Sequence, residues 1–339
     1  YHVQHSQEID LMNLIVRPSS NTITVSLPFM QAVFLATIML IMPWELIMRA
    51  DHFTDFERYV EYFNRETEFT YIVQGYDTFW KFISGEALWD VLNIVLTDLI
   101  GDARYSLRLF SWITFFLWAF LIIKRANFLL AVLFLFNPVV IDVGMSGIRN
   151  GLAWSLFFFA VYEVKSLLRL LVILSTIFIH TTAIFLVVIY VLYIFRSSRA
   201  RLLSFFDMYY GFILGTIVLT APLIIFYYLP DRRLVDYIRG DPSVLQSIYF
   251  YVIFFLFFVS VRKRTFDLTS FFSINLIGLY ISLSFEIAWA YRVWGASIPV
   301  IALLHYHEFG RYKQVVLFLW SSYTIVWYFY WTKLFNFIS

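Results

Sequence analysis

The sequence of 339 residues contains no cysteine. Disulfide bonds, thiol chemistry and cysteine-based metal sites are therefore excluded, while the compartment stays open. Charged residues make up only 14% of the chain, and the formal net charge of +2 is too small to indicate a nucleic-acid partner. The polar stretch at residues 1–24 lacks a short apolar core, so we expect no cleavable signal peptide.

Apolar side chains dominate the composition instead. They account for 61% of the residues, with 39 Phe, 23 Tyr and 11 Trp, which lies outside the range of soluble domains. Several apolar runs approach the ~20 residues that a helix needs to cross a bilayer. We therefore predict an all-α polytopic membrane protein, a single integral membrane domain over residues 1–339, with about eleven transmembrane or re-entrant helices. One of the predicted spans is Phe128–Val143.

Basic clusters fall at every second connection between the apolar runs, and the positive-inside rule makes those connections cytoplasmic. The clusters are Lys124/Arg125, Lys165/Arg169, Arg196/Arg199/Arg201, Arg262/Lys263/Arg264 and Arg311/Lys313. The opposite side then receives an extracytoplasmic segment at 49–105, with an interfacial helix at Ala87–Leu99, and extracytoplasmic loops at 230–246 and 286–295. Translocated loops are normally poor in arginine, yet these parts carry it, so we expect an anionic ligand on that side.

The apolar run Leu170–Phe195 is long enough to be one tilted span. Arg169 and Arg196, however, flank it on both sides and belong to basic clusters. We therefore predict two short helices that enter and return, with His180–Thr182 at the tip. If the run is one span instead, every later loop changes sides.

Two polar blocks interrupt the apolar runs, Ser146–Ala153 and Phe178–Ala183. The first contains Arg149 and the second contains His180. A charged side chain in hydrocarbon costs at least ~2.5 kcal/mol, so a membrane protein that keeps one usually uses it. The structural alternative for Arg149 is an ion pair with Asp142 or a side chain that reaches the interface.

Carboxylates and aromatic rings gather in the segment 49–105. Sugars bind to such mixtures, because aromatic faces stack on pyranose C–H surfaces while carboxylates accept directional hydrogen bonds. Glu45, within the first span, has Arg49 on the next helical turn, and we interpret that pair as structural.

Five motifs occur in a characteristic order and spacing: Asp55–Tyr59, Gly85–Trp89, Arg108, Ser146–Ala153 and Ile179–Ala183. In this respect the chain resembles the EpsG-like branch of the Wzy-type polysaccharide polymerases. The resemblance covers roughly residues 30–200, and Asn150 stands where that family usually has Gln.

The resemblance implies a GT-C-like glycosyltransferase architecture in the bacterial inner membrane, with the active site on the periplasmic or extracytoplasmic side. Such proteins join undecaprenyl-diphosphate-linked oligosaccharide repeat units without a cofactor and without a metal. The expected partners are these lipid-linked oligosaccharides and the lipid bilayer, and a chain-length regulator is left open.

The chemistry of that reaction suggests a role for each candidate residue. Guanidinium groups suit a leaving diphosphate, because their paired N–H donors bind phosphate oxygens and they never lose their charge. We predict this role for Arg149, Arg292 and Arg108. The acceptor hydroxyl needs a base, for which His180, Glu86 and Asp55 stay open. The residues expected to contact glycan are Asn150, Tyr59, Tyr62, Trp89 and Trp289.

Three other functions remain alternatives. An O-antigen-type ligase shares the donor and differs in the acceptor. A flippase or transporter of the lipid-linked glycan would also need arginines in a cavity, but the internal repeats typical of transporters are missing. A membrane-bound acyltransferase also uses an intramembrane histidine, but its donor arrives from the cytoplasm, where the chain shows no matching polar cluster.

Overall fold

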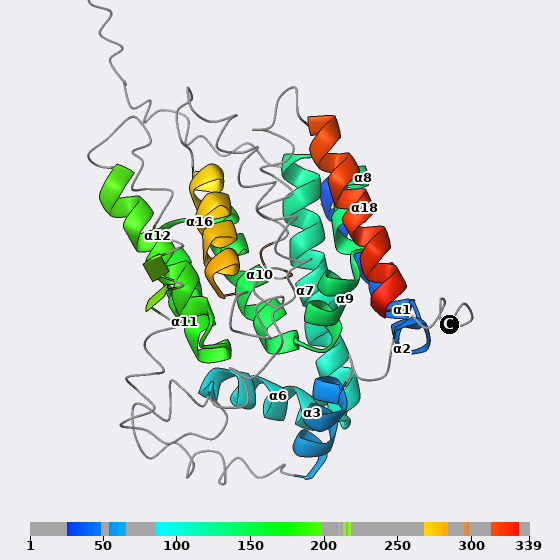
Figure 1. Ribbon diagram of the computed structural model, residues 1–339. Helices are drawn as coiled ribbons and strands as arrows, with labels where there is room; N and C mark the ends of the chain where they lie inside the picture. Colours follow the sequence, from blue (N-terminus) through cyan, green and yellow to red (C-terminus); the bar gives the residue numbers. More distant parts are fainter. Residues whose placement is uncertain are drawn as a thin grey trace, which may run out of the picture.

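The computed structural model describes residues 26–48, 54–65, 86–197, 268–283 and 313–331, together with single positions at 210, 213, 214, 216, 217, 295 and 297. Over these ranges the chain is helical and contains no β-strand, as predicted (Figure 1). The predicted number of spans and the GT-C-like arrangement stay predictions.

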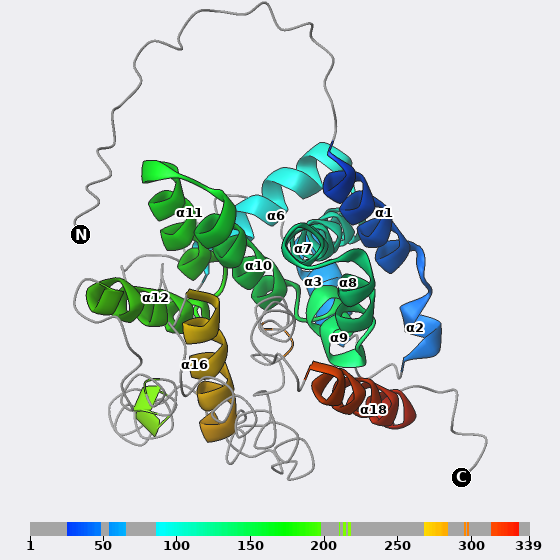
Figure 2. The ribbon, with the colours of Figure 1, turned by 90° about the horizontal axis from the view of Figure 1, so that it is seen from above.

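Helices α6 to α12 follow one another through short connections, whereas most of residues 66–85, 198–267 and 284–312 lie outside the described ranges. The described helices are α1 (Leu27–Ile41), α2 (Trp44–Ile47), α3 (Thr54–Arg65), α6 (Ala87–Ile100), α7 (Ala103–Arg125), α8 (Phe128–Leu135), α9 (Pro138–Met145), α10 (Ile148–Glu163), α11 (Ser166–Ile179), α12 (Ala183–Ser197), α16 (Leu268–Leu283) and α18 (Lys313–Trp331). Figure 2 shows α7 end-on near the middle of the bundle, with α1 packed beside it.

Helix α7 is the described helix that is long and apolar enough to cross a membrane by itself. Its 23 residues rise about 35 Å at ~1.5 Å per residue, which exceeds the ~30 Å hydrocarbon core. Asp102 caps its first turn by accepting a hydrogen bond from the backbone N–H of Arg104 at 2.7 Å. Lys124 and Arg125 occupy its last turn, where positive charge stabilises the helix end.

The run predicted as a span at Phe128–Val143 is not one continuous helix, because the chain bends by 79° between α8 and α9. Pro138 has no N–H to continue the hydrogen-bond pattern of α8. Asn137 starts α9 instead, with its Oδ1 accepting from the backbone N–H of Val139 at 2.9 Å. Together the two pieces are apolar enough to be one broken span, which would be the second candidate span in the described ranges.

Helix α18 packs against this bend and forms hydrogen bonds with polar groups of the bend. Tyr328 donates its hydroxyl to the carbonyl of Phe136 at 2.5 Å, and Asn137 donates its amide to Thr324 Oγ1 at 3.0 Å. In a similar way, Trp320 donates its indole N–H to a carbonyl of α8 at 3.2 Å. The bend is therefore an ordered part of the core.

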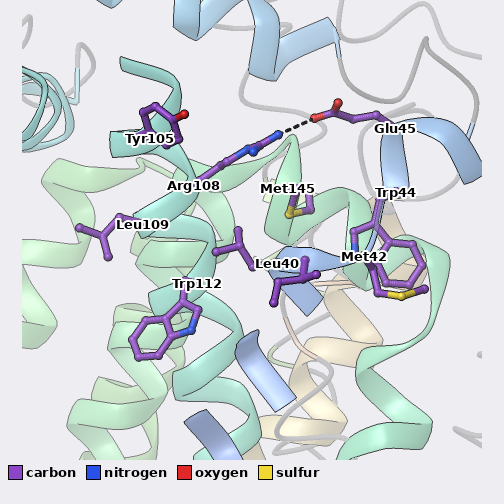
Figure 3. Close-up of a pocket in the computed structure, with 10 residues that line it drawn as sticks. Leu40, Met42, Trp44, Glu45, Tyr105, Arg108, Leu109, Trp112 and Met145 are labelled. Atoms are coloured by element: carbon purple, nitrogen blue, oxygen red, sulfur yellow. Dashed lines mark ion pairs between the residues drawn. The ribbon is translucent and has the colours of Figure 1, made fainter. Parts of the chain in front are cut away.

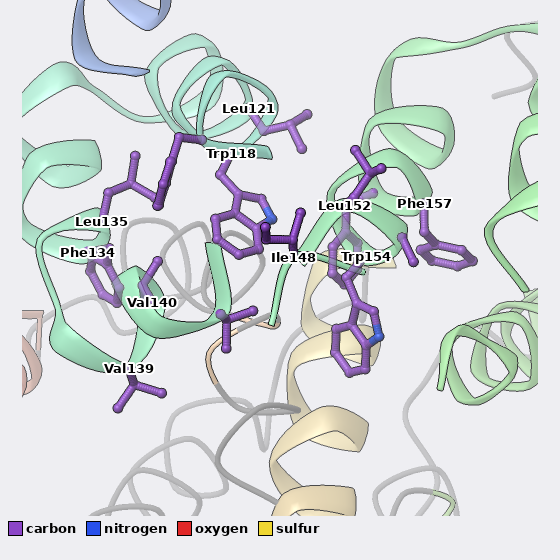
Figure 4. Close-up of a cluster of buried hydrophobic side chains, with 14 of the residues drawn as sticks. Trp118, Leu121, Phe134, Leu135, Val139, Val140, Ile148, Leu152, Trp154 and Phe157 are labelled. Atoms are coloured by element: carbon purple, nitrogen blue, oxygen red, sulfur yellow. The ribbon is translucent and has the colours of Figure 1, made fainter. Parts of the chain in front are cut away.

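The core lies where α7, α8, α9 and α10 meet (Figure 4). Trp118, Phe134, Val140 and Trp154 are fully buried there. At the junction of α9 with α10 the packing is close enough that a Cβ on Gly151 would stand 2.8 Å from a backbone carbonyl of α9. This contact fixes the first turn of α10 relative to the bend.

The bundle has two chemically different ends. At one end Glu163, which ends α10, pairs with Lys124 and Arg125 at the end of α7. At the other end α6 lies crosswise beneath the bundle (Figure 1), close to where α10 begins. The break predicted at His180–Thr182 is present between α11 and α12, and it lies at this second end.

Candidate active site

The site is organised around Glu86, the residue that precedes α6. Its backbone adopts the left-handed conformation (φ 60°, ψ 46°), which costs a residue with a side chain about 1 kcal/mol or more. The carboxylate does not cap its own helix and is only 4% exposed. The unusual backbone conformation directs a charged group into the protein interior.

Three groups from two other parts of the bundle converge on this carboxylate. Arg149, in the first turn of α10, donates a guanidinium N–H to Oε2, and His180 Nδ1 contacts Oε1. The backbone N–H of Thr181 also donates to Oε1, at 3.1 Å. Glu86 thereby connects α6, α10 and the break between α11 and α12, which are far apart in sequence.

The electrostatic environment keeps Glu86 ionised. Burial by itself would raise the pKa of this carboxyl, but the charges and hydrogen bonds of His180 and Arg149 outweigh burial and lower the pKa to about 2. Glu86 is thus a poor proton acceptor at neutral pH. It is well suited to hold a guanidinium and an imidazole in place.

Arg149 combines this ion pair with an aromatic contact. Its guanidinium carbon lies 5.0 Å from the ring centroid of Tyr59 on α3, in cation–π geometry. Its Nε is buried without a hydrogen-bond partner, and the side chain as a whole is 33% exposed. The alternative pairing with Asp142 is not what the structure shows, since the ion pair of Arg149 is with Glu86. Part of the guanidinium is accessible to an anion.

Two hydrogen bonds hold the break between α11 and α12 against α10. Thr182 donates its hydroxyl to Asn150 Oδ1 at 2.8 Å and accepts from the indole N–H of Trp154 at 3.2 Å. Asn150, predicted to contact glycan, is only 3% exposed, so its amide serves this internal contact. The effect is to fix the backbone that carries His180.

The aromatic residues predicted to bind glycan differ in how far their side chains are exposed. Trp89 is 1% exposed and packs against Tyr59, Phe63 and Phe110, so its ring belongs to the core. Tyr62 is 39% exposed, although its ring also makes an edge contact with Phe63. Tyr59 lies between these two situations, beneath Arg149.

The remaining predicted site residues lie away from the Glu86 cluster or outside the described ranges. Asp55 forms an ion pair with Arg58 at 3.7 Å on α3. Arg108 pairs with Glu45 at 3.5 Å, whereas we expected Glu45 to pair with Arg49, which the structure does not describe. The other predicted site residues and loops outside the described ranges are Arg292, Trp289, 230–246 and, apart from Gly295, 286–295.

A metal site is the other chemistry to consider here. Within the described ranges, no three His, Asp or Glu side chains gather as metal ligands would. The expectation of metal-free and cofactor-free chemistry stays a prediction.

Sequence reasoning found Glu86, Arg149 and His180 but did not connect them. It also missed the supporting roles of Thr181, Thr182 and Trp154, although both threonines stand in the same motif as His180. The signal that could have linked them is charge balance, since a buried arginine and a histidine need a carboxylate nearby.

The sequence model of the EpsG family matches residues 32–339, which is nearly the whole chain. No curated protein and no solved structure matches it. Together with the apolar helix α7, the family match indicates a membrane protein.

Proposed function

Since the chain belongs to the EpsG family, which is a family of Wzy-like polymerases, we propose that it joins undecaprenyl-diphosphate-linked oligosaccharide repeat units into a surface polysaccharide. The reaction would take place at the outer face of the bacterial inner membrane. The single observation that supports this most is the cluster of Arg149 and His180 on the ionised carboxylate of Glu86.

The reaction requires one bond to break and one to form. The bond between the anomeric carbon of the donor and its diphosphate oxygen breaks, and the acceptor hydroxyl oxygen bonds to that carbon. The hydroxyl proton passes to a base, and the diphosphate leaves with the bonding electrons. The protein therefore needs a cation for the diphosphate and a base for the proton.

Arg149 is the cation in this proposal. Its guanidinium is partly exposed and can donate terminal N–H groups to phosphate oxygens. Tyr59 and Glu86 hold the side chain from two directions, so little ordering is needed when the donor binds. The position in the first turn of α10 adds the positive end of the helix dipole.

His180 is the base in this proposal, in preference to Glu86 and Asp55. With its pKa near 2 and both oxygens engaged, Glu86 is unsuited to take a proton. It contacts Nδ1 of the imidazole, which leaves Nε2 as the nitrogen that would receive the proton of the acceptor hydroxyl. A carboxylate that orients a histidine in this way also stabilises the imidazolium that forms.

A surface-glycan gel from a strain that lacks the gene tests the function. Loss of a polymerase leaves single repeat units on the lipid anchor of the cell surface, and we expect this result. A ligase deletion would instead leave unattached polymer, and a flippase deletion would leave neither product. Either of these two patterns would refute the proposal.

A further inference from the structure

A groove outside the Glu86 cluster has the shape and chemistry of a lipid-binding site. It lies between the end of α1, helix α2 and the first half of α7, with a cavity volume of about 440 Å³. Figure 3 shows Arg108 and Glu45 at one end and apolar side chains beyond them. The apolar part is formed by Leu40, Met42, Leu109, Trp112 and Met145.

Arg108, at the polar end of the groove, is only weakly paired and can donate hydrogen bonds to a ligand. Its ion pair with Glu45 is long, at 3.5 Å, and both side chains are about 40% exposed (38% and 44%), so the pair is weak. Its Nε is buried without a hydrogen-bond partner. A ligand cannot reach this buried atom, but it can reach the terminal N–H groups of the partly exposed guanidinium, which bind phosphate oxygens well.

The order of residues along α7 matches an amphiphile. Tyr105 and Arg108 come first, near the end of the helix that Asp102 caps, and Leu109 and Trp112 follow toward the middle of the candidate span. Ile41, across the groove, is 74% exposed and apolar. A hydrocarbon chain that starts at Arg108 can therefore run along apolar surface into the bilayer.

We infer that this groove binds the diphosphate and the first isoprenoid units of the acceptor lipid. The inference rests on the proposed function, in which two lipid diphosphates are present at once. The donor diphosphate leaves at the reacting centre, which contains Arg149 and His180. The acceptor reacts through a sugar hydroxyl a whole oligosaccharide away from its own diphosphate, so that group needs a separate site.

Glu45 makes the inference testable in two directions. Its carboxylate competes with phosphate for Arg108 and repels it, so the two variants should act in opposite ways. Removing the charge of Arg108 should weaken lipid diphosphate binding, whereas Glu45→Gln should strengthen it. A general loss of folding would weaken binding in both.

The experiment uses the full chain in phosphatidylcholine nanodiscs and a photoreactive farnesyl diphosphate, with cross-linked peptides identified by mass spectrometry. We expect labelling on α1 and on the Leu109–Trp112 part of α7. It should fall about tenfold in Arg108→Gln, rise in Glu45→Gln and stay unchanged in Arg58→Gln, an exposed arginine on α3. No labelling on α1 and on the Leu109–Trp112 part of α7, or equal labelling there in the first two variants, would overturn the inference, whereas labelling beside Arg149 is expected from the donor site.

Unlabelled compounds that compete with the probe show which class of ligand the groove binds. Unlabelled farnesyl diphosphate should displace the probe, whereas inorganic diphosphate and phosphatidylglycerol should do so only weakly. Equal displacement by phosphatidylglycerol would show a general phospholipid site, and equal displacement by inorganic diphosphate would show a free phosphate site. Because no sugar takes part, the result does not depend on polymerase activity, which the surface-glycan gel tests separately.

Discussion

At the residue scale, the central feature is the carboxylate of Glu86, which contacts both Arg149 and His180. From the sequence, these two residues could be named only as separate candidates. Arg149 and His180 could be named as functional candidates from the sequence, because charged and polar groups in apolar runs cost free energy. The role of Glu86 was not predictable, since it depends on the left-handed backbone at that residue and on a contact across 94 positions. Our proposal therefore assigns the base to His180 among the three candidates that the sequence left open.

Arg149→Lys tests whether the site needs the paired N–H donors of a guanidinium or only a positive charge. Lysine keeps the charge but loses the paired N–H donors and the fixed plane over Tyr59, so polymer should fall by about a hundredfold at unchanged protein level. The measurement is a surface-glycan gel with an immunoblot. Arg58→Lys, on the exposed side of α3, is the matched control and should leave polymer normal. Normal polymer from the Arg149 variant would show that the residue is structural.

Glu86→Gln tests the lowered pKa of Glu86 through the pH dependence of the unfolding free energy. A carboxyl whose pKa is lowered from 4.5 to about 2 in the folded protein stabilises it fully above pH 4.5 and loses that effect as pH falls toward 2. The wild type should therefore exceed the variant in unfolding free energy by about 3 kcal/mol at pH 7, and less as the pH falls below 4.5. Denaturant unfolding in detergent across this range measures the difference. A gap that stays constant from pH 7 to pH 3 would contradict the lowered pKa.

At the element scale, the sequence predicted helices better than it predicted their breaks. The break at His180–Thr182 followed from basic residues on both flanks. The bend between α8 and α9 was missed although Asn137 and Pro138 signal a turn, because the apolar run continues through them. Its ordering by α18 depends on contacts nearly 190 positions away, which no local pattern contains.

Asn137→Ala tests the bend. It removes both the cap of α9 and the hydrogen bond to Thr324, so the unfolding free energy should fall by about 2 kcal/mol. Asn127→Ala is the matched control, because Asn127 caps α8 through a hydrogen bond to Leu130 N–H and should cost only about 1 kcal/mol. Equal losses in the two variants would show that the contact with α18 contributes little.

At the scale of the whole molecule, composition alone predicted a helical membrane protein, and the family match and α7 agree with it. The two ends of the bundle also differ as the basic clusters suggested, with Lys124 and Arg125 at one end and the Glu86 cluster at the other. Which end faces the cytoplasm follows from the positive-inside rule and stays a prediction.

The cysteine-free chain makes this sidedness directly measurable. Leu99, 76% exposed on α6, and Lys165, exposed between α10 and α11, mark the two ends. In intact spheroplasts a membrane-impermeant thiol reagent should label Leu99→Cys, whereas Lys165→Cys should react only after permeabilisation. The reverse pattern would place the Glu86 cluster on the cytoplasmic side and would exclude an outer-face polymerase.

The measurement that tests the account most directly is chain extension by the purified protein. Supplied only with lipid-diphosphate-linked repeat units in detergent, the wild type should form longer lipid-linked chains. His180→Gln should bind the donor normally but extend it at least about a hundredfold more slowly, because only the proton acceptor is lost. Near-normal extension by His180→Gln, or no extension by the wild type, would contradict the assignment of His180 as the base of a glycan polymerase.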